Sequence, residues 1–226
     1  MIEKQLKLIM LYLIGLALII FPGCAAGPKY SGFLGDNYKY LKPGPEGGVG
    51  KVWLDPDADF QKYHKIMLDS VVFYYAPDSE DKSIDANEMK ELTDAFNQAF
   101  VDALKDTYPL VSEPGPDVVR LRVAITDIKK SMPVVSGVTS VIPAGLALSI
   151  AKKGTTGTWS GAGEASMELM AMDSMSNKVI AAAVDKRSAG FTERFTRLGS
   201  AKEAFKYWAG RLKWFIETEG GKKVKK

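Results

Sequence analysis

The chain is poor in the residues that most often build metal centres and covalent crosslinks. Its 226 residues include one cysteine, Cys24, and one histidine, His64. A single cysteine has no partner for an intramolecular disulfide, so the fold has to depend on packing alone. One histidine without further thiolates or imidazoles does not make a conventional zinc site. We therefore expect no bound metal and no cofactor.

The chain also lacks an excess of charge of either sign. Its formal net charge is +3, and removing residues 1–23, which hold two lysines and one glutamate, lowers it to +2. Nucleic-acid-binding domains usually present a strongly basic face. The composition therefore predicts no nucleic-acid partner, while an apolar content of 46% is that of an ordinary globular protein.

The N-terminus has the layout of a secretory signal peptide. Lys4 and Lys7 precede an apolar run over residues 8–20, and residues 21–23 lead from this run to Cys24. A cysteine after a glycine at this point resembles the bacterial lipobox, in which cleavage makes the cysteine the new N-terminus and its thiol carries a diacylglycerol. We predict a signal peptide over residues 1–23 and lipidation of Cys24.

A second interpretation of the same segment stays open. Residues 8–27 carry no charge, and a span of about 20 apolar residues is long enough to cross a bilayer. The segment could therefore be an uncleaved anchor that contains Cys24 as a structural thiol. Pro22 and the glycines in the last third of the run favour cleavage and lipidation.

Residues 24–62 alternate turn-forming residues with aromatic ones. Glycine, proline and aspartate recur at 27–28, 42–48 and 55–57 and favour turns. A disordered linker would be poor in aromatic residues, whereas this segment contains several. We expect a tether that is partly ordered against a single domain over residues 63–220, followed by a basic tail over residues 221–226.

Hydrophobic periodicity predicts two helices in this domain. Asp85 and Glu88 form a variant of the capping box, and apolar residues follow at helical spacing up to Leu104. A second helix is predicted to begin at Ser200, with Glu203 completing another capping box. Each helix has an apolar stripe that we expect to face the core.

Strands are predicted between and before the helices. Residues 65–75 are β-branched and aromatic with two largely apolar faces, which indicates an interior strand. Residues 118–126, 164–172 and 178–186 follow, the last two joined as a hairpin by the turn at 173–177. The element order predicts an α+β fold: a mixed, mainly antiparallel sheet with two main amphipathic helices packed on it.

If the first two of these later strands pair, two arginines would oppose two glutamates. Arg120 and Arg122 would then face Glu164 and Glu168 across the sheet. Such a cluster resembles a polar active site, but cross-strand ion pairs on a solvated face explain it better.

An uncharged segment, residues 131–151, is flanked by lysine pairs on both sides. Its apolar length approaches a membrane span, although prolines and glycines disfavour one straight helix. We weigh a flap on the bilayer or an oligomer interface against a buried loop that completes the core. The residues predicted to make the membrane or oligomer contact are Val141, Ile142, Leu146, Leu148 and Ile150.

Nothing in the sequence meets the requirements of a catalytic site. A Ser-His-Asp arrangement would need His64 as its base, and no nucleophile elbow is present. The glycine-rich residues 44–50 lack the lysine and hydroxyl pattern of a phosphate-binding loop. We therefore predict a protein that is not an enzyme, with an envelope hydrolase that uses His64 as an alternative.

Three groups of residues carry a family resemblance across nearly the whole mature chain. They are residues 31–34, 41–48 and 63–69; residues 114–127; and residues 163–166, 181–187 and 204–209. Together they resemble a family of predicted Gram-negative lipoproteins known only as a domain of unknown function. The resemblance implies an envelope location and supplies no catalytic or ligand-binding residues. Ala25 after the cysteine resembles lipoproteins passed on to the outer membrane.

These observations together predict a lipid-anchored protein on the periplasmic face of the outer membrane. We expect a non-enzymatic binding or assembly module that contacts the membrane through its N-terminal lipid, with an envelope protein or a second copy as partner. The main alternative is a membrane-inserting oligomeric component that uses residues 131–151.

Overall fold

The computed structural model describes residues 30–77, 79, 84–131, 163–188, 190 and 196–220. Cys24 and the predicted contact residues from Val141 to Ile150 lie outside the described residues. The described parts form one sheet with two long helices, so the predicted α+β class is confirmed.

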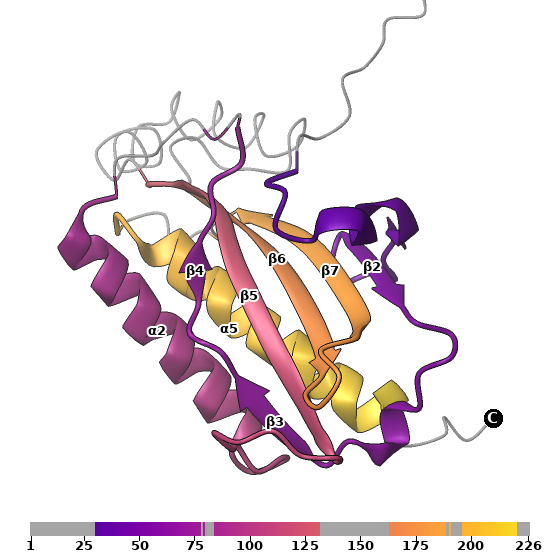
Figure 1. Cartoon of the computed structure of the whole chain (residues 1–226). Helices are drawn as coiled ribbons and strands as arrows, with labels where there is room; N and C mark the ends of the chain where they lie inside the picture. The colour runs from indigo at the N-terminus through magenta and orange to yellow at the C-terminus, as the bar shows by residue number, and fades with distance from the viewer. Residues whose placement is uncertain are drawn as a thin grey trace, which may run out of the picture.

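The sheet has seven strands, which run along the chain as follows: β1 (Lys42–Pro43), β2 (Lys51–Leu54), β3 (Lys65–Leu68), β4 (Val72–Phe73), β5 (Val118–Lys129), β6 (Glu164–Asp173) and β7 (Val179–Ser188). Their order across the sheet is β1-β2-β7-β6-β5-β3, with β4 paired to β5 beyond the end of β3. All pairs are antiparallel except those of β3 and β4 with β5. Strands β5, β6 and β7 form the long centre of the sheet (Figure 1).

Two helices, α2 (Ala86–Leu104) and α5 (Gly199–Phe215), cover one face of the sheet (Figure 1). Phe96 of α2 stacks on Phe100, with ring centroids 4.2 Å apart, and meets Phe205 of α5 edge-on at 5.5 Å. Trp208 packs beside Phe205, and all four aromatic side chains are buried. The predicted apolar stripes therefore meet one another and the sheet in the main core.

A smaller second core lies on the opposite face of the sheet, here called the outer face. Met170 and Met172 of β6 and Ala182 of β7 pack there against Leu34, which is buried. Leu34 immediately precedes the short helix η1 (Gly35–Tyr40). The described part of the segment predicted as a tether thus covers the outer face and contributes β1 and β2 to the sheet.

The prediction of a single interior strand over residues 65–75 is wrong. The structure has two short strands there, β3 and β4, which both pair with β5 at the edge of the sheet and are separated near Asp69. Asp69 lies between the two strands, and its carboxylate accepts two hydrogen bonds from Arg120, at 2.8 and 2.9 Å. Ile66 and Val71 are nevertheless buried, since the main core extends under this edge.

The predicted capping box of α2 is confirmed, whereas that of α5 is wrong. The Asp85 side chain accepts from the backbone N–H of Glu88, and Glu88 accepts from the backbone N–H of Asp85. Helix α5 instead begins at Gly199, so Ser200 lies inside its first turn and is buried. Glu203 accepts from the backbone N–H of Gly190 at 2.8 Å.

The predicted pairing of arginines with glutamates across β5 and β6 is also wrong. The register places Arg120 opposite Met172 and Arg122 opposite Met170. Glu168 lies opposite Ala124 and is buried, so it has a different set of partners, described below.

Candidate functional site

An apolar cavity of about 190 Å³ lies between the sheet and the C-terminal half of α5. Its floor is formed by alanines of β6 and β7, among them Ala171, Ala181 and Ala183. Leu212 and Phe215 of α5 lie over these alanines. Space remains because methyl groups on the strands do not fill the gap that larger strand residues would fill.

The walls of the cavity come from segments that are distant in sequence. Val52 and Leu54 of β2, Phe60 of the short helix η2 (Phe60–Lys62), and Tyr63 line one side. Among the described lining residues, Arg211 is the only charged one. Its guanidinium lies 4.3 Å from the ring centre of Trp214, which is 40% exposed and marks the open end of the cavity.

A buried carboxylate connects the β2 side of the cavity with helix α5, which lies over it. Asp185 of β7 accepts a hydrogen bond from Trp208 Nε1 of α5 at 2.7 Å and from the backbone N–H of Gly50 at 2.8 Å. Asp185 is only 5% exposed, and such a group is tolerated when donors satisfy it. The loop before β2 is fixed a second time, since Tyr207 Oη donates to the carbonyls of Gly47 and Gly48.

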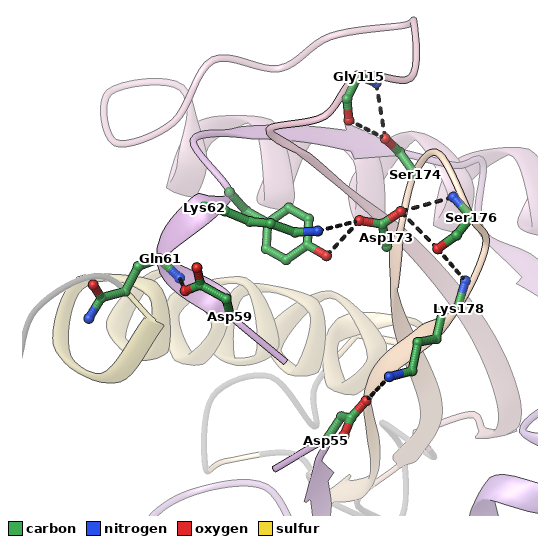
Figure 2. A network of polar contacts seen from close by, with 10 residues as sticks. Asp55, Asp59, Gln61, Lys62, Gly115, Asp173, Ser174, Ser176 and Lys178 are labelled. Atoms are coloured by element: carbon green, nitrogen blue, oxygen red, sulfur yellow. Dashed lines mark hydrogen bonds and ion pairs between the residues drawn. The ribbon is translucent and has the colours of Figure 1, made fainter. Parts of the chain in front are cut away.

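A second carboxylate network fixes the wall beside η2 (Figure 2). Asp173 accepts from Lys62 Nζ at 2.8 Å, from Tyr63 Oη at 2.9 Å, and from the N–H and Oγ of Ser176 at 2.9 and 2.8 Å. The Lys62 ammonium and the Ser176 donors hold the pKa of the Asp173 carboxyl well below its usual range. Tyr63 is therefore held against the cavity while its hydroxyl is already engaged.

A third buried carboxylate fixes the N-terminal segment to the outer face. Glu168 of β6 is 1% exposed and accepts from the N–H of Ser31 at 3.1 Å, from Ser31 Oγ at 2.7 Å and from Tyr38 Oη at 2.5 Å. Burial, together with the hydrogen bond to Glu168, raises the pKa of Tyr38. The hydroxyl therefore stays protonated and continues to donate.

The predicted site residues are placed as follows. Cys24, Val141, Ile142, Leu146, Leu148 and Ile150 all lie outside the described residues, so the structure does not place them. His64 is exposed, and its backbone N–H donates to the carbonyl of Asp117 at 2.8 Å. The described residues contain no cluster of histidine, cysteine and carboxylates that could hold a metal ion.

The cavity and the three carboxylates were not identified from the sequence. In the sequence, residues 31–34 belong to the predicted tether and residues 181–183 to a predicted strand, and both sets belong to the family resemblance. Nothing local to Glu168 indicated partners 130 and 137 residues away. Among the described residues, no helix has both the length and the apolar character that a membrane span requires.

Residues 29–212 match the model of a family described as a protein of unknown function (DUF3313). The chain belongs to this family. The predicted resemblance to a family of unknown function is confirmed by this match, which includes every described strand and most of α5.

Curated relatives of the chain are lipoproteins of unknown function. Over 121 residues the chain is 31% identical to the uncharacterized lipoprotein YdcL of Escherichia coli K12, covering 50% of this chain and 53% of YdcL. YdcL of E. coli O157:H7 matches equally. The chain thus spans about half the length of the curated relatives it matches.

Similar solved structures are much more distant in sequence. One is the PelC dodecamer of Paraburkholderia phytofirmans, with 11% identity, a TM-score of 0.41, and coverage of 72% of this chain and 96% of PelC. Another is the hypothetical protein CT253 of Chlamydia trachomatis, with 11% identity, a TM-score of 0.41, and coverage of 68% and 98%.

Replacing Glu168 by alanine is expected to release the N-terminal segment from the sheet. Loss of a buried acceptor for several donors should lower the free energy of unfolding by about 2–4 kcal/mol, measured by urea denaturation. Trypsin should also cleave after Lys39 faster than in the wild type. The control is Glu164→Ala on the same strand and face, whose partner Lys186 is 55% exposed, and it should cost less than about 1 kcal/mol.

Stability should depend on pH through Asp173. Its pKa is lower in the folded than in the unfolded chain, so its contribution is complete above the unfolded value and is lost as pH falls below it. Between about pH 5 and pH 2, urea midpoints should therefore fall more steeply for the wild type than for Asp173→Asn. Parallel pH profiles for the two proteins would contradict the assigned network.

Proposed function

We propose that this protein is a lipid-anchored protein of the bacterial envelope that binds an apolar ligand and is not an enzyme. Membership of DUF3313 and similarity to the lipoprotein YdcL support the envelope location. The residues around Cys24 resemble a lipobox, which supports attachment through an N-terminal lipid. By that resemblance, Ala25 favours the periplasmic face of the outer membrane. The proposed partner is an envelope protein or a second copy of the chain.

The observation that carries the binding function is the cavity beneath α5. A comparable engineered cavity of about 150 Å³, lined by apolar side chains, stays dry and binds benzene. The cavity here is larger, at about 190 Å³, and its lining is almost entirely apolar. A polar group placed among the alanines and aliphatic side chains of the cavity would lose its hydration without gaining hydrogen bonds, and the nearby Tyr63 hydroxyl already donates to Asp173.

The open end of the cavity indicates the form of the ligand. Arg211 lies there beside the exposed ring of Trp214, so a cation is available to a carboxylate or phosphate that stays near solvent. A short acyl chain with an anionic end satisfies both parts of the site. The ligand class we propose is therefore a single acyl chain carried by an acidic lipid or fatty acid.

Lipidation is tested by the intact mass of protein purified from its native membrane. The expected mass is that of residues 24–226 carrying a diacylglycerol and a further acyl chain. Cys24→Ala should lose both the lipid mass and the membrane association. A wild-type mass equal to the whole unmodified chain of 226 residues would favour the uncleaved anchor instead.

Filling the cavity tests the binding function. Ala183→Leu places a larger side chain among the residues that line the cavity and should weaken octanoate binding at least tenfold in calorimetry. The matched control is Val184→Leu, which adds bulk to the outer face of the same strand and should leave affinity unchanged. Equal affinity in all three proteins, or no binding by the wild type, would refute the cavity as the ligand site.

A further inference from the structure

The N-terminal segment, residues 30–41, crosses the outer face of the sheet from one side to the other. At the β2 side, Lys51 Nζ donates to Tyr30 Oη at 2.7 Å. In the middle, Ser31 and Tyr38 hold Glu168 of β6. At the opposite side, the ring of Phe33 lies 6.1 Å from that of Tyr74, just beyond β4. The segment therefore contacts the outer face at both sides and in the middle.

This surface is aromatic and carries cationic side chains. Tyr40 stacks on Trp53 with ring centroids 5.0 Å apart and is 44% exposed. Tyr74 is 48% exposed at the other side. Lys39 is also exposed, and its Nζ lies 5.0 Å from the centre of the Tyr40 ring. Tyrosine, tryptophan and lysine are the side chains that accumulate at the boundary between membrane and water.

The short distance in sequence to the lipid site limits where this surface can lie. Tyr30 follows Cys24 by six residues, and an extended chain advances at most about 3.6 Å per residue, so the two Cα atoms are at most about 22 Å apart. Tyr30 is itself fixed to the outer face through Lys51 and by stacking on Tyr38 at 4.4 Å. A lipid on Cys24 therefore keeps Tyr30, and the part of the outer face to which Tyr30 is fixed, within about 22 Å of the attachment point.

We propose that the outer face is a membrane-docking surface, in which Tyr40, Trp53, Tyr74 and Lys39 contact the phospholipid headgroups. The proposal rests on the lipidation of Cys24 given under the proposed function. Lys39 lies beside the Tyr40 ring on this surface, and its ammonium group is attracted to anionic lipids. The helix layer and the open end of the cavity beside α5 then lie on the other side of the sheet.

The test measures how close Trp53 comes to lipid headgroups. The lipidated protein is placed in vesicles of phosphatidylethanolamine and phosphatidylglycerol at 3:1, with and without a lipid that carries a nitroxide on its headgroup. The nitroxide should quench part of the tryptophan fluorescence of the wild type. Trp53→Phe should remove at least half of the quenchable signal, because this conservative change deletes the reporter and keeps an aromatic ring under Tyr40.

The matched control is Trp214→Phe, which removes the exposed tryptophan of α5 on the opposite side of the sheet and should leave the quenched signal unchanged. A charge variant, Lys39→Glu, should lower quenching about twofold while the lipid keeps the protein on the vesicles. The proposal would be overturned if Trp214→Phe removed the quenched signal, or if Trp53→Phe left it unchanged. So would crosslinking of the outer faces of two copies through Lys39.

Failure of the lipid anchor has a different signature. An unlipidated protein would lack the lipid mass and would not sediment with the vesicles. A protein that sediments with the vesicles but shows no quenching of Trp53 retains its anchor and contradicts only the docking surface.

Discussion

The contact between Glu168 and the N-terminal segment decides how this molecule is built. A carboxylate at the centre of the outer face is costly to bury, and three donors from Ser31 and Tyr38 make the burial tolerable. The same donors would be unsatisfied without it. One interaction therefore brings a segment next to the proposed lipid site onto the middle strand of the sheet. The second core, with Leu34 against Met170 and Met172, lies beside that contact.

Strand β6 consequently serves two cores at once. Met167 and Leu169 point to the helices, whereas Glu168 and Met170 point to the N-terminal segment. The two faces differ in chemistry: the helix side joins large aromatic side chains, and the outer side combines a carboxylate with tyrosines. The cavity belongs to the helix side, where the alanines of β7 leave space under α5. Binding and attachment to a membrane can thus use opposite faces of one sheet.

The sequence allowed the elements to be predicted well and their contacts poorly. Amphipathic spacing and the capping box at Asp85 are local signals, and both identified α2 correctly. The strand alternation and the hairpin turn at 173–177 were equally local. By contrast, the apolar composition of residues 65–75 suggested an interior strand, because composition does not distinguish an edge covered by other segments from the centre of a sheet. The capping box at Ser200 failed because the helix began one residue earlier.

The candidate site could not be predicted from the sequence for the same reason. A cavity is a property of which side chains are absent between packed layers, and alanines in a strand do not reveal what lies above them. Asp173, Asp185 and Glu168 are ordinary surface carboxylates by sequence, and only the structure shows that each links distant segments and that Asp185 and Glu168 are buried. The family resemblance included residues 31–34 without indicating that they bind a strand far along the chain.

The distance in sequence between Ser31 and Glu168 has a consequence for how the protein matures. The two residues are 137 positions apart, so Ser31 near the N-terminus is fixed to one of the last strands of the sheet. Contacts of such separation form late in folding, because the intervening loop has to be closed first. If the chain is exported N-terminus first, as proposed, Ser31 cannot be fastened to the sheet before β6 has emerged. Lipidation of Cys24, also proposed above, would then precede the docking of Ser31 and Tyr38, which would follow as a late step of assembly.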